Sequence, residues 1–324
     1  MNVRPGISAI SYAVPAESRS VRELAAAGSL ESDAVLLERF GFERVGVAVE
    51  ETPYDLALAA ASDLLRDHHI DPSSIDALLY AGAPGALAFA KPRDALTAAR
   101  ALCDTRRFEF AATRLQFDLS LDNATVLGLD QLACTAILGA VRMARALCIA
   151  EGLERVLCVS SEFYPAAAGR EAITNGTSDA ACAVLVERNA NRNRVVGGVS
   201  VTKGFYWSGD RASMRDEIMA SYFPTAARVM HRTIASAGWD KAAVNWIMPH
   251  NVSATSWDIL LRLAGLPNAR LWNRNIARIG HTLSGDNFIN LRDALDGGAV
   301  RAGDKVLVFS YGYGAHWTGL ALEA

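Results

Sequence analysis

The amino-acid sequence predicts an α/β fold. Short apolar segments of the length of buried strands alternate with longer segments whose apolar residues recur at helical spacing. The chain has 324 residues, of which 51% are hydrophobic and 21% charged, so it can bury a sizeable core as one large domain or two fused halves. The formal net charge of -3 and the lack of a basic patch give no indication of nucleic-acid binding.

The first half alternates predicted strands with predicted helices. Residues 6–14 form an apolar segment that ends at Pro15, as expected of a strand. Residues 53–67 carry an alanine and leucine face typical of an amphipathic helix. The other elements expected in this half are strands at 75–82 and 155–161 and helices at 92–102 and 137–150.

The second half begins after residues 189–194 (NANRNR), a polar segment without periodicity that is typical of a loop. Strands are expected at 195–201, 243–249, 305–311 and 318–323, and helices at 223–238, 256–264 and 284–297. Because both halves run strand, helix, strand, helix, strand, we expect an N-terminal half over residues 1–188 and a C-terminal half over residues 195–324. The shared order suggests a duplication, without a visible residue-level repeat.

The cysteines and the apolar segments favour a cytoplasmic protein. The five cysteines are odd in number and include no CxxC pair, which argues against a disulfide framework or a zinc site and favours a reducing compartment. The N-terminal residues lack the basic and apolar regions of a secretory signal. Charged residues interrupt the longest apolar segments before they reach the ~18 residues of a membrane span, so no membrane partner is expected.

Cys134 is the first candidate for chemistry. It stands at the start of a long apolar helical segment, where the positive end of the helix dipole favours a thiolate. A thiolate exchanges one thioester for another at little cost, so this residue could carry an acyl group. A buried structural cysteine is the alternative, and it is the interpretation that we keep for the other four cysteines.

Two histidines and an aspartate are the next candidates. His250 ends an apolar strand and precedes a polar turn, a place where α/β proteins bind ligands. His281 and Asp286 stand five residues apart at the start of a helix, so Asp286 could fix the tautomer of His281 as in nucleophile–His–Asp triads. The alternatives are a turn-capping role for His250, and a loop histidine followed by a helix N-cap for His281 and Asp286.

Residues 310–317 (SYGYGAHW) form a glycine turn between aromatic residues. The glycines allow close approach of the backbone, and a backbone N–H in this turn could contribute to an oxyanion hole. His316 is expected to pack on Trp317 instead of taking part in catalysis.

A series of segments in order along nearly the whole chain resembles the ketoacyl-ACP synthase III branch of the thiolase superfamily. The resemblance implies a duplicated, five-layered αβαβα thiolase fold, a homodimer and a buried tunnel that ends at the cysteine. It also implies an oxyanion hole formed by the backbone N–H groups of Cys134 and Tyr313. The segments are FGFERVGVA (40–48), LDQLACTAILGAVRMA (129–144), RVLCVSSE (155–162), NGTSDAACAVLVE (175–187), PHN (249–251), GHT (280–282) and YGYGAHWTGLAL (311–322).

The departures from the family's pattern indicate an unusual acyl transfer. His281 stands where the family has asparagine, and a small antibiotic-pathway branch of the family is similar in pairing this histidine with an aspartate five residues on. Members of that branch transfer acyl groups to a hydroxyl or select unusual starter units. The resemblance therefore implies a triad of Cys134, His281 and Asp286, with His250 retained beside it.

The expected donor is an acyl group on an acyl carrier protein or on coenzyme A. Val35 falls where the family has a tryptophan that stacks on the adenine of coenzyme A, which favours the carrier protein. Arg39 and Arg170 could still meet donor phosphates. No metal or nucleotide cofactor is expected, because the histidines lack ligand spacing and no phosphate-binding glycine loop precedes a helix.

Three functions are compatible with this reading of the sequence. The first is an acyltransferase that passes an acyl group from Cys134 to the hydroxyl of a small-molecule acceptor, or loads a polyketide starter. The second is a decarboxylating condensing enzyme that forms a C–C bond, with His281 in the role of the asparagine. The third is an inactive partner subunit of a heterodimeric synthase, although such partners tend to lose the cysteine and histidine that this chain keeps.

Overall fold

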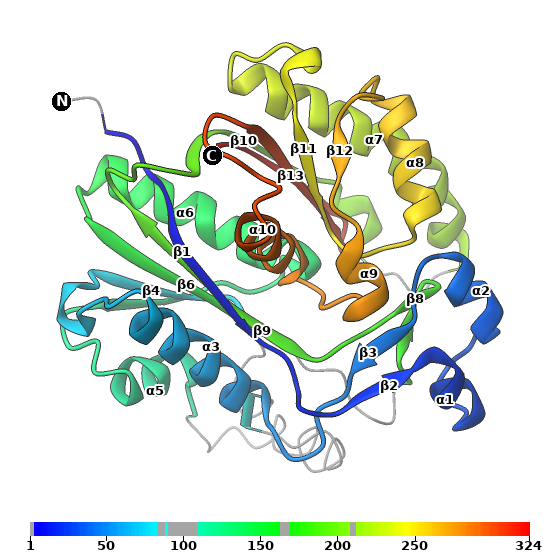
Figure 1. The fold of residues 1–324 in the computed structure, drawn as a ribbon, viewed down its shortest axis with the longest axis horizontal. Helices are drawn as coiled ribbons and strands as arrows, with labels where there is room; N and C mark the ends of the chain where they lie inside the picture. The colour runs from blue at the N-terminus through cyan, green and yellow to red at the C-terminus, as the bar shows by residue number, and fades with distance from the viewer. Residues whose placement is uncertain (1–2, 83–87, 90–108, 163–168, 208–211) are drawn as a thin grey trace.

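The computed structural model describes residues 3–82, 88–89, 109–162, 169–207 and 212–324. Its strands form two five-stranded arrangements, with helices outside each and between them (Figure 1). The α/β class predicted from the sequence is confirmed. The helix predicted at 92–102 lies outside the described residues.

The first sheet has the strand order β1-β9-β6-β4-β5. Strands β1 and β6 are antiparallel to β9, whereas β4 is parallel to both β6 and β5. Helix α3 packs on β1, β6 and β9 from outside, and α5 packs beside it on β4 and β5. The elements are β1 (Gly6–Ala13), β4 (Ala77–Tyr80), β5 (Thr125–Gly128), β6 (Arg155–Glu162), β9 (Ala180–Glu187), α3 (Pro53–Asp67) and α5 (Ala111–Asp118).

The second sheet has the strand order β10-β14-β13-β11-β12. Its outer face is covered by α7, which packs on β10, β13 and β14, and α8 packs against α7. The elements are β10 (Arg194–Thr202), β11 (Trp246–Pro249), β12 (Arg270–Leu271), β13 (Lys305–Gly312), β14 (His316–Glu323), α7 (Ala212–Ser236) and α8 (Ala254–Leu263).

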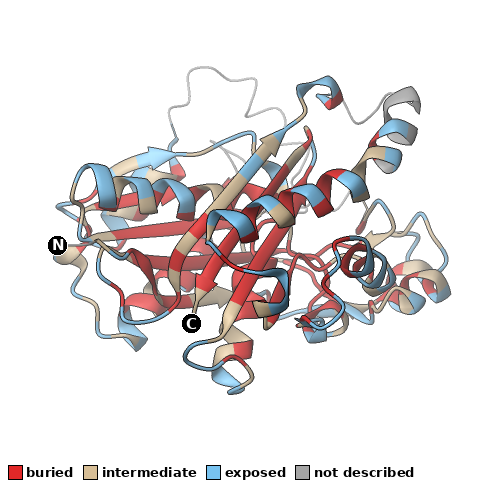
Figure 2. Cartoon of the chain, turned by 90° about the horizontal axis from the view of Figure 1, so that it is seen from above, coloured by how far each residue is buried: buried red, intermediate tan, exposed pale blue. Residues whose placement is uncertain are grey.

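Helices α6 (Ala136–Ala150) and α10 (Asp286–Asp296) form the layer between the two sheets (Figure 1). Helix α6 contacts β6, β9 and β14, and α10 contacts β1, β9, β11 and β13, so each helix touches both sheets. Figure 2 shows the buried residues concentrated in the strands and on the helix faces turned toward them. Residues 133–150 are apolar and long enough for a membrane span, but half of this segment is buried inside the protein, as expected of the central helix in a layered core.

Shorter elements gather at one end of the molecule, beside α9 and the start of α2 (Figure 1). They carry the loops that approach the functional residues. They are β2 (Ser18–Ser20), α1 (Val21–Ala26), α2 (Ala34–Arg39), β3 (Arg44–Gly46), β7 (Glu171–Ala172), β8 (Asn175–Gly176) and α9 (Arg274–Arg278). Other connections contain the 3-10 turns Pro72–Ser74, Ala133–Thr135, Gly204–Tyr206 and Lys241–Ala243.

The main differences from the predicted elements lie at their ends. Helix α7 starts at Ala212, well before the predicted start at residue 223, and so it contains Pro224 in its interior. A proline often marks the first turn of a helix, because it lacks the backbone N–H that residues in the helix interior donate. Pro224 is therefore consistent with a helix start near residue 223, but the helix begins earlier. The strand predicted at 243–249 covers only Trp246–Pro249, because a 3-10 turn, Lys241–Ala243, precedes it. Strand β9 had no counterpart among the predicted elements.

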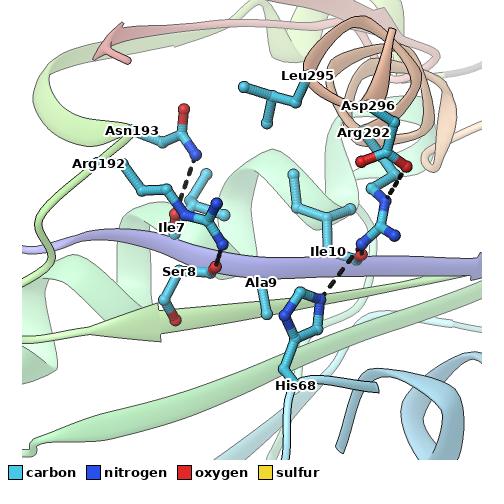
Figure 3. A pocket seen from close by; sticks show the side chains of 10 residues that line it. All are labelled: Ile7, Ser8, Ala9, Ile10, His68, Arg192, Asn193, Arg292, Leu295 and Asp296. Carbon is cyan, nitrogen blue, oxygen red and sulfur yellow. Dashed lines mark hydrogen bonds and ion pairs between the residues drawn. The ribbon is translucent and has the colours of Figure 1, made fainter. Parts of the chain in front are cut away.

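The two sheets meet where β1 pairs with β10 at Gly6 and Arg194, and they diverge beyond this pair. Side chains then take the place of the missing strand partner. Figure 3 shows Arg192 donating to the carbonyl of Ser8 at 2.7 Å and Arg292 donating to that of Ile10, also at 2.7 Å. A pocket of about 110 Å³ lies between these side chains. Because both arginines satisfy backbone carbonyls, we assign them a structural role at the junction.

Candidate active site

Cys134 lies in the 3-10 turn Ala133–Thr135, which runs directly into α6. The backbone of Ala133 has a positive φ of 46°, a conformation that non-glycine residues rarely adopt and that recurs at functional sites. The Ser310 hydroxyl donates to the carbonyl of Cys134 at 2.8 Å. This bond ties the nucleophile turn to β13, and Cys134 itself remains partly exposed while Cys148, Cys158 and Cys182 are buried.

His281 lies between Cys134 and Asp286. Its Nε2 atom is 3.5 Å from the Cys134 Sγ, and its Nδ1 atom is 2.5 Å from the Asp286 Oδ2. Both His281 and Asp286 are buried, with 4% and 0% of their surface exposed. Because Asp286 binds Nδ1, the Nε2 atom can exchange a proton with the Cys134 sulfur, or with a substrate group that occupies the position next to it.

Asp286 is held by donors that the sequence interpretation did not single out. The backbone N–H of Asn251 donates to Oδ2 at 2.6 Å, and the N–H and hydroxyl of Thr282 donate to Oδ1 at 2.6 and 2.7 Å. These bonds fix the direction of the carboxylate. In the sequence, these donors to Asp286 could have been found only by their positions, since Asn251 directly follows His250 and Thr282 directly follows His281.

The charges of this cluster make His281 a strong base. Burial by itself would lower the pKa of His281, but the negative charges of Asp286 and Cys134 outweigh burial and raise the pKa to about 10. An acyl group on Cys134 would remove one of these charges. The pKa of His281 would then fall, so His281 would release its proton more readily after acylation than before.

His250 occupies a different position from His281. It follows β11, it is buried, and its ring centroid lies 6.2 Å from that of His281. Burial and the neighbouring His281 lower the pKa of His250 to about 3, so the imidazole is neutral at physiological pH. Its ring also packs edge-on against Trp257, at a centroid distance of 5.5 Å. A neutral imidazole in this position can donate a hydrogen bond but carries no charge.

The loop that carries His281 is fixed to the first half of the chain. His281 N–H donates to the carbonyl of Gly176 and its carbonyl accepts from the N–H of Ser178, both at 2.8 Å. The preceding Gly280 has a φ of +80°, and a Cβ there would lie 2.9 Å from the Gly176 carbonyl oxygen. Only glycine fits this close approach, so the segment 175–187 positions a residue more than ninety positions away.

Glu162 is a further ionisable group at this site. It ends β6, and its carboxylate accepts a hydrogen bond from the Ser284 hydroxyl at 2.5 Å. Burial raises the pKa of Glu162 to about 7, whereas the Ser284 bond and His281 lower it and Asp286 raises it. Ser284 lies between His281 and Asp286 in the chain, so its hydrogen bond to Glu162 helps to fix the loop that holds both residues.

The chain is similar in sequence and in fold to known proteins. Residues 234–324 match the family of 3-oxoacyl-(acyl-carrier-protein) synthase III C-terminal regions. Beta-ketoacyl-(acyl-carrier-protein) synthase III of Rhodobacter capsulatus is 26% identical over 332 aligned residues that span both chains completely. The crystal structure of 3-oxoacyl-(acyl-carrier-protein) synthase III from Aquifex aeolicus VF5 covers 99% of this chain and all of its own, with a TM-score of 0.81 at 20% identity. The fold is that of ketoacyl synthase III in the thiolase superfamily.

Two other structures with this fold are an acyltransferase and a priming ketosynthase. ChlB3, an acyltransferase, has a TM-score of 0.80 at 18% identity, over 99% of this chain and 98% of its own. The priming beta-ketosynthase from the R1128 polyketide biosynthetic pathway has a TM-score of 0.77 at 19% identity, over 98% of this chain and 96% of its own. The homologues indicate an enzyme of the thiolase superfamily, and the fold is shared with a priming ketosynthase of a polyketide pathway.

A cavity of this ketoacyl synthase III-like chain is lined in part by His250. It has a volume of about 240 Å³ and reaches His250 and Tyr311. Aromatic residues of α7, Tyr222 and Phe223, form one wall, and Phe40 at the end of α2 lies at another side. Among the described residues, none of the side chains that line it carries a formal charge at neutral pH, since His250 is neutral.

The two arginines predicted to bind the donor differ in their exposure to solvent. The prediction that Arg170 contacts donor phosphates is wrong, because Arg170 is only 4% exposed and pairs with the buried Asp179 at 2.7 Å. A buried arginine with a carboxylate partner stabilises the fold and does not reach phosphates at the surface. Arg39 is exposed in the last turn of α2, next to Phe40 of the cavity, and its contact with a donor stays a prediction.

The glycine turn lies against the nucleophile turn, as an oxyanion hole requires. A Cβ at Gly312 would lie 2.8 Å from the carbonyl oxygen of Leu132 and 3.0 Å from the backbone N of Cys134. Tyr313 follows in the same turn and is 41% exposed. The participation of the Tyr313 N–H in an oxyanion hole stays a prediction.

Proposed function

We propose that this chain is an acyltransferase that holds an acyl group as a thioester on Cys134 and passes it to the hydroxyl of a small-molecule acceptor. The observation that carries this proposal is the line Cys134–His281–Asp286, in which a carboxylate-bound imidazole stands 3.5 Å from the sulfur. Such an imidazole can remove a proton from a hydroxyl. Loading of a polyketide starter uses the same acyl-enzyme, and the fold shared with the R1128 priming ketosynthase supports it.

In the first step, the thiolate of Cys134 attacks the carbonyl carbon of the donor thioester. The C–S bond to the carrier breaks, the new C–S bond to Cys134 forms, and the carrier thiol leaves with a proton from His281 Nε2. The backbone N–H groups of Cys134 and Tyr313 would stabilise the negative oxygen of the intermediate. We propose an acyl carrier protein or coenzyme A as the donor, in line with the carrier named in the synthase III relatives.

In the second step, the acceptor hydroxyl attacks the acyl-Cys134 carbonyl. His281 takes the hydroxyl proton through Nε2, the C–O bond forms, and the C–S bond breaks to return the thiolate. The proposal explains why Asp286 is held so firmly, because its carboxylate stabilises the imidazolium that forms during this transfer. General-base catalysis of this kind contributes ~10²–10⁴-fold to a rate.

A decarboxylating condensing enzyme is the second candidate. The synthase III relatives support it, and the buried neutral His250 beside His281 could help to stabilise an enolate. In that reaction a malonyl thioester loses CO₂ and its carbon attacks acyl-Cys134, so CO₂ release separates this candidate from the first.

The test follows the acyl group on the enzyme. The purified chain is incubated with acetyl and malonyl groups on coenzyme A and on a carrier protein, and its intact mass is measured, with Cys134→Ala as the control. We expect an adduct on the wild type alone, which small alcohols then remove as their esters without release of CO₂. An adduct that yields CO₂ and a 3-oxoacyl product would favour condensation. No adduct with any donor would support the inactive partner subunit and refute the proposal.

We also propose that the enzyme is a cytoplasmic homodimer. A reducing compartment keeps Cys134 reduced, as the first step requires.

In the described part of the chain, β5 forms the end of the first sheet and has one strand neighbour, β4, and Leu127 on it is 40% exposed. An uncovered strand edge of this kind can pair with another chain. Light scattering of the purified protein would test this, and the mass of a single chain would refute it.

A further inference from the structure

The cavity beside His250 holds two buried polar atoms without a partner. They are the Tyr311 Oη and the His250 Nδ1, which accept or donate no hydrogen bond within the part of the chain that the structure describes. Tyr311 is only 8% exposed, so bulk water has little access to its hydroxyl. A buried hydroxyl without a partner costs stability, and its retention points to a function.

The position of Tyr311 follows from the alternation along β13. Its neighbours Ser310 and Gly312 both touch the nucleophile turn, so Tyr311 points to the opposite face of the strand. There its ring packs against Tyr222 and Trp317, each at a centroid distance of 5.0 Å. These ring contacts hold the Tyr311 side chain in one orientation, with its hydroxyl at the wall of the cavity.

The environment of Tyr311 keeps its hydroxyl neutral. Burial raises its pKa, and the nearby charges of Tyr313 and Cys134 raise it further, so the group is a hydrogen-bond donor at all physiological pH values. The remaining lining is apolar or neutral, which disfavours a charged ligand.

We propose that Tyr311, together with His250, forms a subsite that binds the hydroxyl oxygen of a neutral, largely apolar acceptor alcohol. This inference rests on the proposed acyl transfer to a hydroxyl and names the class of acceptor. The Tyr311 Oη donates a hydrogen bond to the acceptor oxygen, and the aromatic wall of Tyr222 and Phe223 contacts its apolar body.

The test compares wild type with Tyr311→Phe, which removes the hydroxyl and keeps the ring. Cys134 is loaded with an acetyl group, and the loss of the adduct is followed by intact mass against the concentration of benzyl alcohol or 1-hexanol. We expect saturable loss in the wild type and a half-saturating concentration about tenfold higher in Tyr311→Phe, the effect of one hydrogen bond. The rate of loading from the donor is measured on the same proteins, so that an effect on the donor is told apart from an effect on the alcohol.

A stability measurement separates binding from structure. Tyr311→Phe removes an unpaired buried hydroxyl, so its melting temperature should equal or exceed that of the wild type. The control is Tyr54→Phe on α3, which loses a hydrogen bond to Asp118 far from the cavity and should melt earlier with unchanged alcohol dependence.

Each of the other possible results would refute either the acceptor subsite or the proposed function. If Tyr311→Phe slows loading and leaves the alcohol dependence unchanged, the hydroxyl serves the donor and the inference is wrong. If the alcohols act on the wild type and the variant alike, or do not act saturably on a loaded wild type, the subsite is also refuted. Failure of every donor to load Cys134 would instead refute the proposed function.

Discussion

Replacement of Asp286 by asparagine tests the base at the centre of the proposed mechanism. The carboxylate accepts four hydrogen bonds of 2.5–2.7 Å from the Asn251 N–H, the Thr282 N–H and hydroxyl, and His281 Nδ1, while it is 0% exposed. An amide has one acceptor oxygen. If that oxygen faces Thr282, the NH₂ group faces the donors of Asn251 and His281. Two buried donors then lack acceptors, which costs about 1–3 kcal/mol of unfolding free energy each.

The kinetic effect of Asp286→Asn has the same origin. The carboxylate is the main charge that raises the pKa of His281 against burial, so the variant lowers this pKa and removes the partner that stabilises the imidazolium. We expect transfer of the acyl group to an alcohol to slow by ~10²–10⁴-fold. The assay is the single-turnover loss of the acyl-Cys134 mass, measured with the melting temperature and over a range of pH.

The matched control is Asp293→Asn on the same helix. Asp293 accepts from Tyr12 at 2.9 Å and from Asn275 at 2.8 Å, outside the active site. We expect this variant to lose stability while its transfer rate stays near that of the wild type. A folded Asp286→Asn protein that transfers the acyl group within threefold of the wild-type rate would show that His281 does not depend on Asp286, and the proposed triad would be wrong.

Three further substitutions test separate parts of the site. His281→Asn removes the proton donor of the first step and the base of the second, so loading of Cys134 should slow and transfer to alcohols should slow by ~10²–10⁴-fold; intact mass and CO₂ release are the measurements, and unchanged transfer would contradict a base at 281. Gly312→Ala would place a Cβ 2.8 Å from the Leu132 carbonyl oxygen and 3.0 Å from the Cys134 nitrogen, so we expect a lower melting temperature and slower loading; wild-type values for both would contradict close packing of the two turns. Burial raises the pKa of Glu162 from 4.5 to about 7, so the folded state keeps a proton that the unfolded state releases in this window, and stability falls as the pH rises through it. Glu162→Gln should flatten this part of the melting-temperature profile, and an identical slope would contradict the shifted pKa.

Several features of the site could be predicted from local sequence. Cys134 could be singled out because it begins a long apolar helix, and His281 and Asp286 because their spacing and glycine flanks resemble a known branch of a family. The bonds around them could not be predicted in the same way. Ser310, 176 positions from Cys134, donates to its carbonyl, and no periodic pattern links two such positions.

The sequence by itself determined the alternation of strands and helices and the residue types available for chemistry. Local periodicity controls the alternation, because a helix or strand must turn its own apolar residues to one side. Only the tertiary structure decided that His281, and not His250, meets the Cys134 sulfur across 147 positions of the chain. It also decided that Arg170 is buried with Asp179, and that the Tyr311 hydroxyl lies at a cavity without a hydrogen-bond partner among the described residues. The physical reason is that these contacts depend on how two sheets pack around α6 and α10, which no single segment specifies.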